Sequence, residues 1–175
     1  MSKSYLVLTA VGPDRPGLVN EISSLVLAAG ANLEDSRMAI LGGEFALLML
    51  VSGEQKAIDE VELRGGDLGA RLGLRLISKP TSSPASSADF LPYRINVTGV
   101  DRPGIVQRVA AVLAGRGVNV ASLESRLSYA PESGTPMFIL EAALQIPSAL
   151  ALADLRRELA TVCEQETWEF ALEAA

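Results

Sequence analysis

Apolar side chains along this chain fall into runs of two different periods, and the same succession of runs occurs twice. In the first half, residues 5–11 form a nearly continuous apolar run with β-branched side chains, which predicts a strand. Residues 16–29 then carry apolar side chains every three or four positions, which is typical of a helix with one buried face. Two further strands are predicted over residues 32–41 and 44–51, with the hairpin turn Gly42-Gly43 between them.

The end of the first half has a weaker pattern. Residues 53–72 predict a second helix, which Gly65-Gly66 interrupts at a cost of about 1 kcal/mol per glycine relative to alanine. The alternation of Leu72, Leu74 and Leu76 predicts a closing strand over residues 72–79. The next stretch is rich in proline and serine, which is typical of a flexible linker.

The second half repeats this order. Tyr93, Ile95 and Val97 alternate with polar residues, as in a strand with one buried face. We then expect a helix, a strand from Val118, a loop over 131–134, a strand over 136–145, a helix capped by Ser148 and a last strand over 164–173. Each half reads β-α-β-β-α-β, the order of the ferredoxin-like fold, in which two helices cover one face of a four-stranded antiparallel sheet. We therefore predict an α+β protein with two tandem domains, residues 1–79 and 92–175, joined by a linker over 80–91.

The two halves are copies of one another. The stretch Gly12-Pro13-Asp14-Arg15-Pro16-Gly17-Leu18-Val19 returns as Gly99-Val100-Asp101-Arg102-Pro103-Gly104-Ile105-Val106, with six of eight positions identical and an offset of 87 (99 − 12 = 87). The same offset relates Asn32 to Asn119 (119 − 32 = 87). Further on, Asp35-Ser36-Arg37 aligns with Glu124-Ser125-Arg126 at an offset of 89, which predicts two extra residues between Asn119 and Glu124.

The repeated turn between strand and helix has the chemistry of an anion site. Residues before proline avoid the helical conformation, so we expect Arg15 to be the cap and Pro16 the first helical residue. The start of a helix leaves backbone N–H groups unpaired at the positive end of its dipole, and glycine there lets a small anion approach. A carboxylate can therefore reach the amides of Gly17 and Leu18, or those of Gly104 and Ile105. Asp14 and Asp101 can pair with an ammonium group, and Asn32 and Asn119 offer donors and acceptors. Together these groups suit an amino acid.

The same residues also suit a helix start that binds nothing, because Asp-Arg-Pro-Gly is good turn chemistry by itself. The joint presence of Asp, Arg, Pro, Gly and Asn in both copies, whose helix exteriors differ, favours the binding hypothesis.

Composition excludes several other classes of function. The net charge is -6 and no run of Lys or Arg is present, which argues against direct binding of nucleic acid. The chain has no histidine, which excludes histidine-based triads and most zinc sites, so we expect no enzyme, cofactor or metal. Cys163 is the single cysteine; it falls on an apolar helix stripe and is predicted to be a core residue in a reducing compartment. No apolar stretch approaches the ~18 residues of a membrane span, so we expect a cytoplasmic protein.

The pattern Gly-x-Asp-Arg-Pro-Gly, followed by a helix and then Asn within a β-α-β-β-α-β unit, resembles the ACT domain, a family of amino-acid-sensing regulatory modules. The whole chain resembles the glycine cleavage system transcriptional repressor family, which consists of two tandem ACT domains; residues 32–38 and 44–47 resemble its first repeat. The resemblance implies domains that pair side by side, as in a homodimer, with an effector at their interface. The implied effector is glycine, and an acidic chain implies repression through a DNA-binding protein partner. The implied ligand-binding residues are Asp14, Gly17, Leu18 and Asn32, with Asp101, Gly104, Ile105 and Asn119 as counterparts. The predicted insertion after Asn119 makes the second site differ from the first.

One alternative stays open. The third strands of both halves, Phe45–Val51 and Met137–Leu144, are apolar and suit a domain or subunit interface. In that case the chain is a protein–protein interaction module, with no ligand or with a different small effector. A screen of melting temperature against amino acids separates the two hypotheses, because only a binding module gains stability by mass action.

Overall fold

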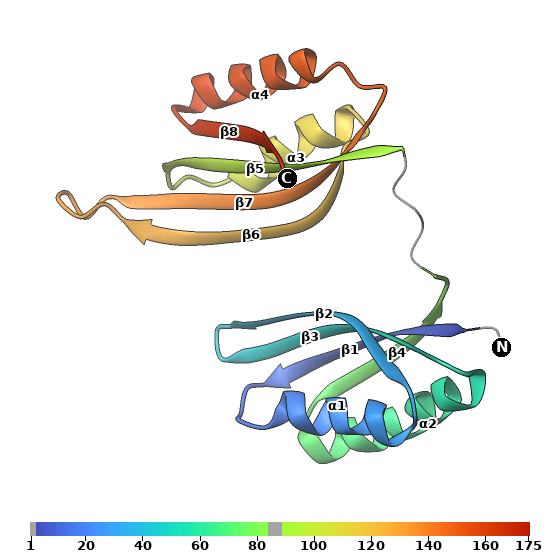
Figure 1. Ribbon diagram of the computed structural model, residues 1–175. Helices are drawn as coiled ribbons and strands as arrows, with labels where there is room; N and C mark the ends of the chain where they lie inside the picture. The colour runs from blue at the N-terminus through green and yellow to red at the C-terminus, as the bar shows by residue number, and fades with distance from the viewer. Residues whose placement is uncertain (1–2, 84–88) are drawn as a thin grey trace. The chain divides into compact units, whose positions relative to one another are not determined.

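The computed structural model describes residues 3–83 and 89–175, and the chain divides into two compact units, Met1–Ala85 and Ser86–Ala175 (Figure 1). Both units have the predicted order β-α-β-β-α-β. The first contains β1 (Ser4–Pro13), α1 (Leu18–Ala28), β2 (Asn32–Leu41), β3 (Glu44–Gly53), α2 (Gln55–Leu72) and β4 (Arg75–Thr81). The second contains β5 (Phe90–Val100), α3 (Ile105–Gly115), β6 (Asn119–Tyr129), β7 (Pro136–Pro147), α4 (Leu152–Glu166) and β8 (Glu169–Ala174).

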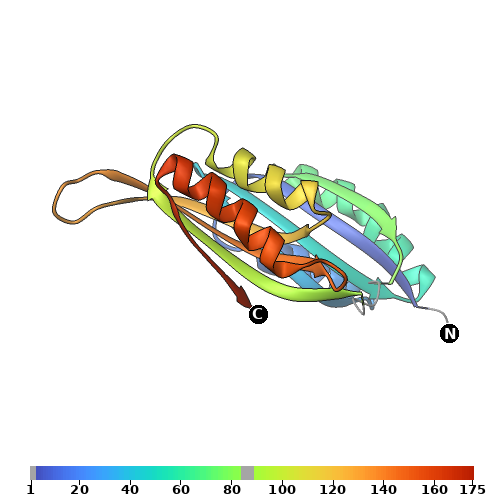
Figure 2. The same ribbon diagram turned by 90° about the horizontal axis from the view of Figure 1, so that it is seen from above.

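Each unit is one antiparallel sheet with its two helices on the same face, which confirms the predicted α+β class (Figure 1). The strand orders are β2-β3-β1-β4 and β6-β7-β5-β8, so β2 and β6 are edge strands. Figure 2 shows α3 and α4 side by side along the strands of the second sheet. The arrangement follows from the alternation of the central strands, which directs every second side chain toward the helices.

The core of each unit lies between its sheet and its helices. Buried residues of β1 and β3 that face α1 and α2 are Leu6, Leu8, Ala10, Phe45, Leu47, Met49 and Val51. In the second unit, Ile95, Val97, Leu140, Leu144, Leu155, Leu159 and Trp168 are buried in the equivalent layer. Cys163 is buried among them, as predicted, and this burial raises the pKa of its thiol.

The second helix of the first unit is continuous, although Gly65-Gly66 was expected to interrupt it. Gly65 and Gly69 lie on its buried face, one turn apart. A β-carbon on Gly69 would stand 2.9 Å from the carbonyl oxygen of Leu74 and 3.2 Å from Cβ of Leu76. Gly69 therefore lets α2 approach β4 closely, whereas a β-carbon on Gly65 would make an ordinary contact, 3.9 Å from Cδ2 of Leu76.

Several predicted boundaries were wrong by a few residues. The closing strand of the first unit starts at Arg75 and not at residue 72, because Gly73 ends α2 in the left-handed conformation (φ 69°). In the second unit Ala151 precedes α4 in place of the predicted cap Ser148, and β8 starts at Glu169 and not at residue 164, because α4 continues through Glu166. The predicted linker begins inside β4, which extends to Thr81, and ends inside β5. Its residues 84–88 lie outside the described residues.

The extra residues of the second copy are not where the sequence comparison placed them. Both edge strands carry a β-bulge, between Leu33 and Asp35 in β2 and between Val120 and Ser122 in β6, so the offset of 87 continues through the strand. The extra length lies in the following hairpin: Leu41 pairs with Glu44, whereas Ser128 pairs with Met137. The offsets of these partners are 87 (128 − 41) and 93 (137 − 44), so six residues are added at this corner (93 − 87). The predicted two-residue insertion after Asn119 was therefore wrong.

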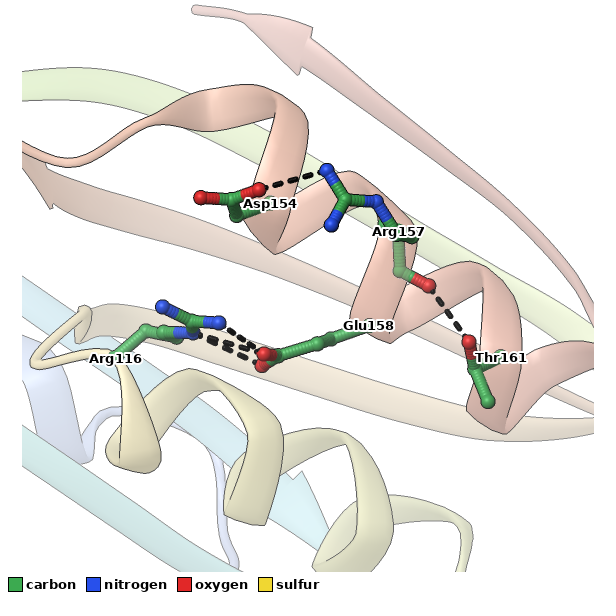
Figure 3. A network of polar contacts seen from close by, with 5 residues as sticks. All are labelled: Arg116, Asp154, Arg157, Glu158 and Thr161. Carbon is green, nitrogen blue, oxygen red and sulfur yellow. Dashed lines mark hydrogen bonds and ion pairs between the residues drawn. The ribbon is translucent and has the colours of Figure 1, made fainter.

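Two arginine–glutamate pairs join α3 to α4. Arg108 near the start of α3 pairs with Glu166 at the end of α4, with 2.5 Å between Nη1 and Oε1. Arg116 at the end of α3 donates from Nε to both carboxylate oxygens of Glu158, at 3.1 and 3.0 Å (Figure 3). These hydrogen bonds hold the pKa of Glu158 below its ordinary value. The antiparallel helices are thus linked at both ends of α3.

Candidate functional site

The repeated turn places a glycine directly before each helix. Gly17 and Gly104 are the N-cap residues of α1 and α3, with φ of 96° and 99°, and in the part of the chain that the structure describes neither has a side-chain cap. The expectation that Arg15 is the cap and Pro16 the first helical residue was therefore wrong. A glycine is required at this position because left-handed backbone disfavours any side chain with a β-carbon. The consequence is a helix start whose first amides have no capping partner from a side chain.

In the first unit this turn opens into a surface hollow. The hollow has a volume of 440 Å³, and its lining residues include Asp14, Gly17 and Leu18 of the predicted site. No atom of the described residues, apart from the glycine's chain neighbours, lies within 4 Å of the position of a β-carbon on Gly17. The side chain of Leu18 is buried in the core, so it can contribute only its amide to a ligand. Five further lining residues were not among the predicted site residues: Arg15, Val19, Asn20, Met38 and Phe45.

Each turn is held to the adjacent hairpin by its aspartate. The backbone N–H of Asp14 donates to the carbonyl oxygen of Gly43 at 3.0 Å, and that of Asp101 donates to the carbonyl oxygen of Pro136 at 3.0 Å. Gly43 and Pro136 are equivalent positions at the offset of 93. Both aspartate side chains are exposed, which leaves them accessible to an ammonium group.

Asn32 does not lie near this turn within its own unit. Asn32 pairs with Ser52, and Ser52 pairs with Tyr5 near the start of β1, whereas the turn follows the end of β1. The 11 residues of α1 separate the two places, which is about 16 Å at 1.5 Å per residue. The same holds for Asn119, whose side-chain amide donates to Oε1 of Gln145 at 2.7 Å at the far end of its sheet. A site that combines the turn with the asparagine therefore needs residues from two β-α-β-β-α-β units.

Asn32 belongs instead to a polar cluster around the bulge of β2. Ser52, which is fully buried, donates from Oγ to Oε1 of Glu34 at 2.5 Å, and the amide of Asn32 donates to the same oxygen at 3.4 Å. Lys3 also pairs with this carboxylate. The hydrogen bonds, with that of Lys3 the largest, lower the pKa of Glu34 to about 2. Glu34 is therefore ionised at neutral pH and is already engaged by partners in its own unit.

The second turn differs from the first in the charge of a neighbouring side chain and in the room in front of its glycine. Arg108 occupies the position of Glu21 (108 − 21 = 87) in the first turn of the helix, so the sign of the charge is reversed. The Nε atom of Arg108 is 3.8 Å from the position of a β-carbon on Gly104. In the first unit, Glu21 pairs with Arg15 at 3.2 Å within the same turn. The reversal of charge could have been found from the sequence, because the offset of 87 aligns Glu21 with Arg108.

The comparisons with known proteins agree with this architecture. The ACT domain family matches residues 4–76, and it matches a second time over residues 93–160. Each unit is therefore an ACT domain, and the chain is a tandem ACT protein.

Similarity over the whole length is more specific. The chain is 32% identical over 164 residues to the glycine cleavage system transcriptional repressor of Escherichia coli strain K12, which covers 94% of this chain and 86% of the relative. A solved structure of an unknown protein from Galdieria sulphuraria has a TM-score of 0.86 at 31% identity and covers 99% of both chains. Another, described as a candidate glycine cleavage system transcriptional repressor, has a TM-score of 0.75 at 31% identity over 100% of this chain and 99% of that one. This chain belongs to the glycine cleavage system transcriptional repressor family, and it is a regulatory ACT protein.

The described residues contain neither a membrane-spanning helix nor a cluster of metal ligands. Among the helices of residues 3–83 and 89–175, none combines the length and the apolar character of a membrane span. Over the same residues, no group of three or more acidic, cysteine or histidine side chains is placed to hold a metal ion.

Proposed function

We propose that this protein is a cytoplasmic amino-acid sensor that regulates glycine-cleavage genes through a DNA-binding protein partner. The effector is a small amino acid, glycine by analogy with the name of the repressor relatives. The single observation that carries the proposal is the helix start at Gly17, which has left-handed backbone, no side-chain cap within the described residues and an open 440 Å³ hollow in front of it. Such a start favours a carboxylate through its free amides and its dipole.

The first turn supplies a partner for each of the two charged groups of an amino acid. The effector carboxylate binds the amides of Gly17 and Leu18, and Arg15, whose side chain is 44% exposed beside Glu21, adds a cation at the edge of the hollow. Asp14 accepts the ammonium group. Glycine has five heavy atoms, and ~1.5 kcal/mol for each limits the binding free energy to about 7.5 kcal/mol, or a Kd of a few micromolar at best.

A homodimer completes the site in this proposal. All ten residues of β2 are exposed, and β2 is an edge strand. A two-fold axis perpendicular to the sheet reverses the strand direction between two copies that pair along this edge. The Gly17 end of one copy then lies beside the Asn32 end of its partner, which overcomes the separation of about 16 Å within one unit. Asn32 thus contributes to the site of the neighbouring copy.

The route to transcription is through a protein and not through direct contact with DNA. The chain has a net charge of -6, which opposes the electrostatic attraction on which DNA binding depends. Effector binding changes the packing of the paired domains and so the surface that a DNA-binding partner recognises. Copurification of such a partner with the tagged protein, in an amount that depends on glycine, tests this step.

Calorimetric titration of the full chain with the twenty amino acids tests the sensor proposal. We expect one of them, glycine first, to bind with micromolar or weaker affinity, and Gly17→Ala to weaken binding at least tenfold. Alanine is a better probe than valine, because φ of 96° strains any β-branched residue severely. If none of the twenty binds, the sensor proposal is wrong.

A second candidate function is supported by the sheet face that the helices leave uncovered. Val11, Leu48 and Ile77 lie on this face of the first sheet and are 42, 47 and 48% exposed. Exposed apolar side chains grouped on one face suit an interaction module that needs no effector. In that case the melting temperature stays constant across the amino-acid screen, while replacing Leu48 by a polar residue abolishes association with the partner.

A further inference from the structure

The two turns share one backbone conformation, but their surroundings differ in three respects. Gly17 has open space where a side chain would begin, whereas Gly104 has the guanidinium of Arg108 at 3.8 Å. The first turn of α1 carries Glu21, and the equivalent residue of α3 is Arg108. The neighbouring helix α4 provides a carboxylate, Glu166. At this point of the chain the two units are offset by 94 residues, as Trp168 and Leu74 show (168 − 74 = 94), so the equivalent residue of the first unit is the apolar Leu72 (166 − 72 = 94).

Glu166 is well placed to act as an internal anion at the second turn. Its Oε1 atom is 2.5 Å from Nη1 of Arg108, and its side chain is only 18% exposed. The next residue, Thr167, ends α4 in the left-handed conformation (φ 61°), and Trp168 is buried against Gly99 of the repeated motif. The direction in which the chain leaves α4 is therefore fixed, and the carboxylate is held beside the start of α3.

We propose that the Arg108–Glu166 pair closes the second turn, so that an effector binds only at the first turn, with one molecule per chain. The inference rests on the proposed function of the first turn. An effector carboxylate at the second turn would have to displace a partly buried internal carboxylate from its arginine, and breaking such a pair leaves a charge without its partner. At the first turn no such displacement is needed, because Arg15 pairs with Glu21 near the surface, where both side chains are about 40% exposed.

Two glycine variants form a matched test of this asymmetry. Gly17→Ala and Gly104→Ala introduce the same side chain at φ of 96° and 99°, so both carry nearly the same backbone strain. Calorimetry with glycine should give one site per wild-type chain, at least tenfold weaker binding for Gly17→Ala, and binding within twofold of wild type for Gly104→Ala. Two sites per chain, or equal weakening in both variants, would overturn the asymmetry while leaving the sensor function intact. A wild type that binds no amino acid would overturn the sensor function instead.

A second measurement tests closure without any ligand. In Glu166→Gln we expect amide hydrogens of residues 105–107 to exchange several-fold faster than in wild type, because the ion pair that holds the end of α4 to the start of α3 is lost. Glu158→Gln breaks the other arginine–glutamate pair between the same two helices and is the control; it should leave exchange at residues 105–107 unchanged. Equal rates in wild type and Glu166→Gln, or the same acceleration in both variants, would show that the pair does not close the turn.

Discussion

The indole of Trp168 lies directly against Gly99, so that a β-carbon at Gly99 would stand 3.0 Å from Cγ of the ring and closer still to Cδ1. Gly99 is the first residue of the repeated motif in the second unit, and its glycine is explained by this contact. The equivalent glycine of the first unit, Gly12, lies against Leu74 in the same way, with 2.9 Å between a β-carbon and Cδ2. Packing, and not only turn geometry, therefore explains why both copies begin the motif with glycine.

Gly99→Ala should destabilise the second unit by about 1–3 kcal/mol, because the added methyl group forces the buried indole out of its position. Trp168 is the only tryptophan, so its fluorescence during urea unfolding reports this unit directly. Gly115→Ala, at the last residue of α3, is the control: apart from the nearby backbone of its own helix and its chain neighbours, no atom of the described residues lies within 4 Å of its β-carbon, and helix propensity favours alanine. Equal stability of Gly99→Ala and wild type would contradict the packing explanation.

Gly66→Ala and Gly69→Ala should have opposite effects although they lie in the same helix. Gly66 is exposed, and apart from its chain neighbours and the nearby backbone of α2 nothing among the described residues lies within 4 Å of its β-carbon, so alanine should stabilise α2 by up to about 1 kcal/mol. At Gly69 the methyl group would meet the carbonyl oxygen of Leu74 at 2.9 Å, and we expect destabilisation by about 1–3 kcal/mol. Thermal unfolding followed by circular dichroism measures both. Effects of the same sign would disprove the close approach of α2 to β4.

Glu34 should make the first unit sensitive to acid. Its pKa is lowered from 4.5 to about 2 in the folded chain, so its contribution to stability is complete above pH 4.5 and is lost as the pH falls toward 2. The difference in unfolding free energy between wild type and Glu34→Gln should therefore shrink across this window. Lys3→Met removes the largest cause of the shift and should raise the pKa of Glu34, which NMR titration of its carboxyl carbon measures. A titration midpoint near 4.5 in the wild-type chain would refute this account.

The hairpin between β6 and β7 should tolerate shortening. Replacing residues 129–136 by Gly-Gly removes six residues and reproduces the corner at Gly42-Gly43, where both glycines have positive φ. The register from Ser128 to Met137 is unchanged by this replacement, and loop closure favours the shorter connection slightly. We expect the free energy of unfolding to stay within about 1 kcal/mol of wild type. A shift larger than this, or loss of the folded second unit, would show that the six residues do more than extend the corner.

The β-α-β-β-α-β order could be predicted from sequence because the core stripes of strands and helices are regular in both copies. The boundaries of the elements were harder to predict. Gly73 ends α2 and Ala151 precedes α4 because of their backbone conformations, which the spacing of apolar residues does not encode. The continuity of α2 through Gly65-Gly66 was misjudged because propensity was considered without the buried helix face, to which Gly65 and Leu68 belong. The position of the inserted residues was missed because a similar tripeptide at an offset of 89 looked like the better match.

The candidate site was predictable in its local part only. Asp14, Gly17 and Leu18 are close in sequence and lie together around the first hollow. Asn32 is close to them in the motif, yet α1 carries the chain away before β2 begins, so sequence proximity is misleading there. The closing of the second turn depends on Glu166, which is 62 residues beyond Gly104 (166 − 104) and can be assigned to the turn only once the fold is known.

The hydrogen bond from the N–H of Asp14 to the carbonyl oxygen of Gly43 links the first turn to the hairpin between β2 and β3. The residues that we propose bind the effector are therefore tied to the corner where β2 meets β3. That corner ends the strand along which we propose that two copies pair. In the proposed dimer, the effector at the helix start therefore lies one hydrogen bond away from the subunit interface, and no further structural element is needed to couple binding to assembly.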